Sequence, residues 1–214
     1  MAVYDLEEQE QISELKAWWA QYGKFVTAIA VAVAVASVGW QGWRWYQARQ
    51  AADAGALYFA VQQAAAQQDA QKTRDLAGRL IDQYGGTAYA QLGALVSAGV
   101  QFGKDDLDNA RAPLEWAAEK GGDAALRDIA RLRLAAVLLQ QGAFDQALAR
   151  LQPDPDKAHL ARFADLRGDV LAAQGKPAEA RVAYQAALDA LTAAGEEAST
   201  LREVVRVKLE SLEG

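Results

Sequence analysis

An uncharged run of 19 residues at 25–43 constrains this chain more than any other feature, and Lys24 and Arg44 bound it. As an α-helix rising about 1.5 Å per residue, the run spans roughly 28 Å, close to the ~30 Å hydrocarbon core of a bilayer. The sequence therefore predicts a transmembrane helix at 25–46. A short acidic tail at 1–24 precedes it, and a larger domain at 47–214 follows.

Aromatic residues gather at both ends of this run. They are Trp18, Trp19 and Tyr22 before it and Trp40, Trp43, Trp45 and Tyr46 at its far end. Tryptophan and tyrosine are enriched at membrane interfaces, because their rings find both apolar and polar neighbours there. The pattern therefore favours an anchor embedded in membrane lipid through residues 25–46 over the buried core helix of a soluble protein.

A cleaved signal peptide is the competing interpretation, because Ala34-Val35-Ala36 offers a small-x-small cleavage site. A signal peptide normally begins with a positive region, whereas residues 1–24 carry five acidic residues and two lysines. We therefore favour the anchor. Charge counting leaves its orientation open, since two lysines precede the run and Arg44 and Arg49 follow it.

Beyond the anchor, apolar residues recur at three- and four-residue spacing between glycines, which predicts helices. Aligning Gly142 with Gly175 gives an offset of 33 residues and brings the small residues Ala135 and Gly168 to equivalent positions. This offset is close to the 34-residue period of tetratricopeptide (TPR) repeats. Asp105 takes the glycine position in a weaker upstream copy, and the segments around Gly121 and Pro153 depart from regular spacing.

The ends of the repeat region complete the predicted fold. Residues 51–84 predict one more helical pair, and a last helix begins with Thr200 and Glu203 spaced as a capping box. An apolar face on that helix suits it to close the end of a helical stack. The predicted class is all-α, with a single N-terminal transmembrane helix followed by a TPR-like α-solenoid of helical hairpins with a C-terminal capping helix.

A concave groove is the expected binding surface, since the first helix of each pair lines the inside of such arrays. By repeat position, the groove residues are Leu95, Phe102, Leu132, Ala136, Leu139, Asp165 and Asp169. A mostly apolar groove with acidic residues at one end suits a helical or extended segment of a partner. Packing against the neighbouring helix is the alternative role for each of them.

Composition and missing motifs exclude several functions. The chain has no cysteine and a single histidine, His159, so most nucleophile–base pairs cannot be assembled. Phosphate-binding, zinc-protease and dinucleotide motifs are absent as well. We therefore expect no enzyme activity, cofactor or metal. The net charge of −6 argues against nucleic acid as a partner, because nucleic-acid binding needs a basic face.

Three segments together resemble the YfgM family of ancillary SecYEG translocon subunits. They are GWRWY at 42–46, RLRLAAVLLQQG at 131–142 and ADLRGDVLAAQGK at 164–176. The resemblance implies a single-pass protein of the bacterial inner membrane with a cytoplasmic tail and periplasmic repeats. It further implies two partners, the SecYEG translocon and a PpiD-like periplasmic chaperone, and a non-enzymatic role in the hand-over of exported proteins.

A regulatory membrane anchor is the alternative function. In that case the acidic tail would sequester a cytoplasmic factor while the repeats sense the state of the cell envelope. An enzyme is a third possibility, which rests only on scattered carboxylates such as Asp105 and Asp106.

Overall fold

Helices make up the regular structure of the described residues in the computed structural model, which confirms the predicted all-α class. The described backbone covers residues 2–152, 154–196 and 199–212, with side-chain surroundings from residue 10 onward. Pro153, where irregular spacing was expected, lies outside these ranges. The chain divides into two compact units between Arg49 and Gln50.

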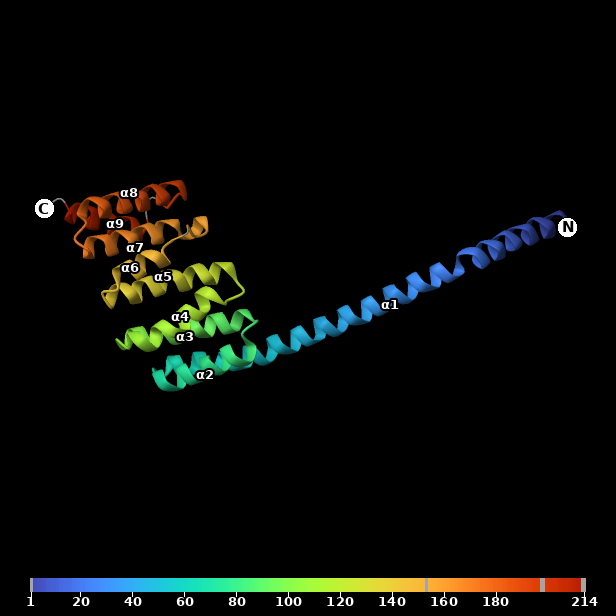
Figure 1. Cartoon of the computed structure of the whole chain (residues 1–214), viewed down its shortest axis with the longest axis horizontal. Helices are drawn as coiled ribbons and strands as arrows, with labels where there is room; N and C mark the ends of the chain where they lie inside the picture. The colour runs from blue at the N-terminus through green and yellow to red at the C-terminus, as the bar shows by residue number, and fades with distance from the viewer. Residues whose placement is uncertain (1, 153, 197–198, 213–214) are drawn as a thin grey trace. The chain divides into compact units, whose positions relative to one another are not determined.

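The first helix, α1 (Ala2–Ala66), is continuous through the predicted tail, anchor and start of the repeats (Figure 1). No proline occurs before Pro113, so nothing in this span removes a backbone donor and breaks the helix. The predicted boundaries after residues 24 and 46 therefore do not coincide with helix ends. The limits of the three regions stay a prediction.

The second unit is a stack of helical pairs (Figure 1). Residues 50–66 of α1 pair with the second helix, and the further elements are α2 (Ala70–Tyr84), α3 (Ala88–Gly103), α4 (Leu107–Glu119), α5 (Ala124–Gln140), α6 (Phe144–Arg150), η1 (Lys157–His159), α7 (Leu160–Ala173), α8 (Pro177–Ala193) and α9 (Thr200–Ser211). The predicted TPR-like hairpins and closing helix are thus present.

One type of turn closes every pair. Its central residue has a positive φ, and these residues are Gln68, Asp105, Gly142 and Gly175 at 56°, 59°, 74° and 74°. In each turn the next N–H bonds the carbonyl five residues back, as in a Schellman helix end. Asp105 thus takes the glycine position as predicted. The first two intervals between turns are 37 residues and the last is 33.

In the last three pairs, a small buried residue on the first helix and a large one on the second occupy equivalent positions. Counted from the turn residue, the equivalent pairs are Ala98 with Leu114, Ala135 with Leu151 and Gly168 with Tyr184. A β-carbon on Gly168 would overlap the ring of Tyr184. The prediction that Gly168 permits close approach of two helices is therefore confirmed, and the larger partner ring explains why glycine replaces alanine there.

Gln91 accounts for the irregular spacing near Gly121. Its side-chain amide donates to the carbonyls of Ala117 (3.3 Å) and Asp123 (3.2 Å) and accepts from the N–H of Asp123 (2.8 Å). A β-carbon on Gly121 would overlap this amide. The loop between α4 and α5 is thus tied to the start of α3.

The predicted capping box at the last helix is wrong. Ser199 is the N-cap, because it has extended backbone angles and its hydroxyl accepts from the N–H of Arg202 at 3.3 Å. Glu203 pairs instead with Arg206 at 3.0 Å. The predicted apolar face is present in part, since Val205 is buried whereas Val204 is 44% exposed.

Candidate functional site

The aromatic residues expected at the membrane interfaces all project from α1. Their exposed fractions lie between 44% and 65%, and they are Trp18, Trp19, Tyr22, Trp40, Trp43, Trp45 and Tyr46. From Trp19 to Trp40 the helix rises about 32 Å, which matches the hydrocarbon thickness. Among the described helices, α1 is the one long and apolar enough to cross a membrane. These observations fit a membrane-anchored protein.

Neighbouring rings contact one another within each aromatic group. Trp18 lies 5.8 Å from Tyr22 between ring centroids, and Trp43 lies 6.3 Å from Tyr46. The guanidinium of Arg49 lies 5.6 Å from the ring centroid of Trp45, within the range of a cation–π interaction. The far group therefore combines aromatic rings with a positive charge, a combination that suits a lipid headgroup region.

The turn register places the predicted groove residues at equivalent positions on successive first helices. Leu95, Leu132 and Asp165 lie ten residues before their turn residues. Gly99, Ala136 and Asp169 lie six before, and Phe102 and Leu139 lie three before.

Their surroundings differ along the stack. Leu95 is only 5% exposed, and Leu132 and Leu139 are half-buried against the main core. These three leucines mainly pack, which agrees with the alternative role that the sequence left open. Phe102 is 40% exposed and Ala136 is half-buried, and both line a pocket.

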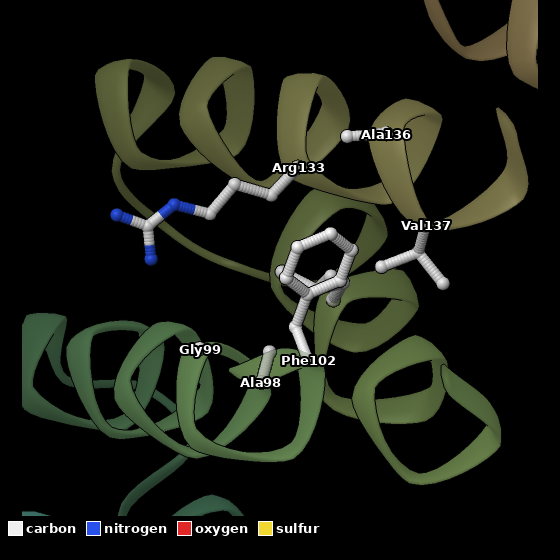
Figure 2. A pocket seen from close by; sticks show the side chains of 7 residues that line it. Ala98, Gly99, Phe102, Arg133, Ala136 and Val137 are labelled. Atoms are coloured by element: carbon white, nitrogen blue, oxygen red, sulfur yellow. The ribbon is translucent and has the colours of Figure 1, made fainter. Parts of the chain in front are cut away.

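This pocket lies between α3 and α5 and has a volume of about 260 Å³. It is lined by Ala98, Gly99, Phe102, Leu114, Arg133, Ala136 and Val137. Figure 2 shows the ring of Phe102 between the two helices, with Arg133, Ala136 and Val137 all projecting from α5. The walls are therefore almost entirely apolar.

Arg133 is the one charged residue in that lining. Its side chain is exposed, and one guanidinium nitrogen donates to the backbone carbonyl of Leu95 at 3.1 Å. No carboxylate pairs with it among the residues that the structure describes. The pocket thus combines an apolar floor with an uncompensated positive charge.

The predicted acidic end of the groove is occupied by the closing helix. Nζ of Lys208 in α9 donates to Asp165 at 2.7 Å and to Asp169 at 2.8 Å. The hydroxyl of Tyr184 donates to the other carboxylate oxygen of Asp169, Oδ1, at 2.8 Å. Both carboxylates therefore have partners within the chain.

The pKa values in this cluster reflect burial and charge together. Burial raises the pKa of Asp165 above its usual value, although the hydrogen bond and charge of Lys208 oppose this shift. Burial lowers the pKa of Lys208, but its hydrogen bonds to Asp165 and Asp169 outweigh burial and raise it overall. Burial and the hydrogen bond to Asp169 raise the pKa of Tyr184.

Sequence reasoning missed both cations of this concave surface. Arg133 lies directly after a predicted groove residue, so its place on the same helix was the available signal. Lys208 pairs with residues 39 and 43 positions earlier, and no local pattern reports such a contact.

Comparison with known proteins extends over nearly the whole chain. A family model described as a tetratricopeptide repeat-like domain matches residues 16–214. The ancillary SecYEG translocon subunit of Haemophilus influenzae is 33% identical over 86% of this chain and 90% of its own length. The protein of that name from Neisseria gonorrhoeae is 30% identical over 97% of this chain and 98% of its own length. The one from Escherichia coli is 28% identical over 99% of this chain and 99% of its own length.

Proposed function

The chain belongs to the tetratricopeptide repeat-like family of ancillary SecYEG translocon subunits, and on that premise we propose that it is a non-enzymatic, membrane-anchored interaction protein of the Sec translocon. The similarity to relatives of that name runs through both the apolar helix and the repeats, since 97% of this chain aligns with the Neisseria gonorrhoeae protein. That shared organisation is the observation on which the proposal rests.

The proposed topology places the tail in the cytoplasm, residues 25–46 in the inner membrane and the repeats in the periplasm. The exposed apolar surface and aromatic ends of α1 support the anchor. Protease treatment of spheroplasts tests the topology, because a periplasmic repeat domain is digested from outside while a cytoplasmic one is protected. Protection of the repeats in intact spheroplasts would contradict it.

The proposed partner of the repeats is a PpiD-like periplasmic chaperone, which receives exported proteins beside the channel. The apolar pocket at Phe102 and Ala136 supports this role, because a protein partner can seat an apolar side chain there. A repeat surface without such a pocket would offer a partner only solvent-exposed contacts, which contribute little to binding.

Photo-crosslinking from position 102 in cells tests the proposed role. We expect adducts with SecY or with the chaperone, and none from position 182 on α8, where Val182 is 70% exposed but lies outside the pocket. Gly99→Leu should abolish the adducts without unfolding the chain, since a β-carbon there meets no atom within 4 Å.

Adducts formed solely with unrelated envelope proteins would overturn the proposal. Deleting residues 2–20 is the second control. If that deletion removes partner binding while the pocket remains intact, the acidic tail rather than the repeat domain carries the interaction.

A further inference from the structure

We propose that the pocket between α3 and α5 recognises an acidic peptide segment, with an apolar side chain seated beside Phe102 and a neighbouring carboxylate bound by Arg133. This inference rests on the proposed function and names the chemistry of the partner segment.

The acidic end of the concave surface is already neutralised from within. Lys208 bonds both Asp165 and Asp169. The two carboxylates therefore already share a cation of the same chain. A basic partner would have to displace Lys208 before it gained a carboxylate.

Arg133 is in the opposite situation. Its single hydrogen bond goes to a neutral carbonyl, that of Leu95, and its other donors have no partner in the described part of the chain. A guanidinium presents several donors in one plane, which matches the two oxygens of a carboxylate. Binding an acidic group there therefore adds charge-assisted hydrogen bonds without breaking an existing ion pair.

The apolar part of the pocket sets the size of the anchor. Its volume of about 260 Å³ lies below the ~300–1,000 Å³ typical of sites for whole small molecules. Gly99 leaves the floor open, and the 40% exposed ring of Phe102 forms a wall that a second apolar group can cover. This space suits one side chain of a polypeptide, as at the centre of many protein interfaces.

Two synthetic peptides test the inference on the full chain in lipid nanodiscs, labelled with ¹³C at alanine and valine methyl groups. Both are acetylated and amidated Gly-Ser repeats with one central leucine. The leucine is followed by two glutamates in the first peptide and by two lysines in the second. We expect only the first peptide to shift the methyl signals of Ala136 and Val137.

Variants separate the charge from the cavity. Arg133→Gln keeps a polar side chain of similar reach and should weaken the acidic peptide about tenfold, the loss expected for a charge-assisted hydrogen bond. Gly99→Leu should abolish the shifts by filling the floor. Arg79→Gln, which removes an exposed arginine on α2 outside the pocket, should leave them unchanged.

Equal binding of the two peptides, binding that survives Arg133→Gln, or no shift at millimolar peptide would each overturn the inference. The proposed function fails separately, through loss of the crosslinks from position 102. Crosslinks that persist while the peptides show no charge preference would overturn only the acidic specificity.

Discussion

The junction of α3 with α5 and the junction of α7 with α9 place a cation at the same repeat position, but the two cations have different partners. In both, the later helix sends a cation toward the residue ten positions before the turn. Arg133 meets the backbone carbonyl of Leu95 at 3.1 Å, whereas Lys208 meets the carboxylate of Asp165 at 2.7 Å.

One residue on the earlier helix thus decides whether the cation is available. An aspartate at that position consumes the cation in an internal ion pair and closes the end of the stack. A leucine leaves the cation at the edge of an apolar pocket. A binding surface and a structural cap thus arise from the same helical arrangement.

The largest expected effect comes from the crossing of α7 and α8. Gly168→Ala restores the small residue of the other pairs but overlaps the ring of Tyr184, so it should lower the free energy of unfolding by about 2–3 kcal/mol. Chemical denaturation of the full chain in nanodiscs, followed by amide hydrogen exchange in α7 and α8, measures the loss.

Tyr184→Leu in the same chain is the informative control. Together the two changes recreate the alanine–leucine pairs found at Ala98 and Leu114, so the double variant should be more stable than Gly168→Ala alone. Simple addition of the two single losses would show that the pair does not act as a unit.

Removing the cation of the closed junction should have a smaller effect. Lys208→Met leaves Asp165 and Asp169 without their shared donor, and we expect a loss of about 1–2 kcal/mol because the cluster is only partly buried. Faster amide exchange in α8 and α9 measures it. Arg206→Met breaks an exposed pair and should change stability by less than about 0.5 kcal/mol.

The closed junction should also weaken at alkaline pH. Burial and the bond to Asp169 raise the pKa of Tyr184, and the bonds to both aspartates raise that of Lys208 against burial. The folded state therefore holds protons that the unfolded chain loses above pH 10, so stability falls as the pH rises above that value.

Amide exchange in α8 and α9 between pH 9 and 11, corrected for the intrinsic exchange rate, follows this loss. Tyr184→Phe keeps the ring beside Gly168 but removes the titrating hydroxyl, so its stability should depend less on pH. An unchanged pH dependence in that variant would contradict the assignment to Tyr184.

A substitution at the open junction should have a small effect of the opposite sign. Gly99→Ala adds a β-carbon that meets no atom within 4 Å, and alanine is the better helix former, so we expect a gain of about 0.5–1 kcal/mol. Thermal unfolding of the full chain measures it. A loss of stability instead would mean that the pocket floor tolerates no added atom.

Local patterns in the sequence predict the repeat well. Gly142 and Gly175 mark two turns, and the weaker upstream copy of the repeat placed Asp105 at the equivalent position. Aspartate tolerates the positive φ there better than most residues. Gln68 adopts the same angle without any such signal. The 37-residue intervals upstream also explain why a 33-residue offset found only a weak copy there.

Local sequence patterns could not predict the charged contacts of the site. The sequence places Asp165 and Asp169 at repeat positions equivalent to those of the other predicted groove residues, but their pairing with Lys208 depends on how α9 packs after α8. Likewise, the sequence predicted boundaries after residues 24 and 46, whereas α1 continues through both positions. Whether the concave residues bind a partner stays a prediction.

The exchange of an alanine–leucine crossing for the Gly168–Tyr184 crossing has a geometric consequence. Curvature in a solenoid accumulates from a small rotation at each repeat, and that rotation depends on how closely two helices approach. A change at two residues can therefore alter the rotation at one repeat while the rotation at the other repeats stays the same. Through such paired changes, a helical stack of this kind can alter the breadth of its inner surface at one repeat and leave the others unchanged.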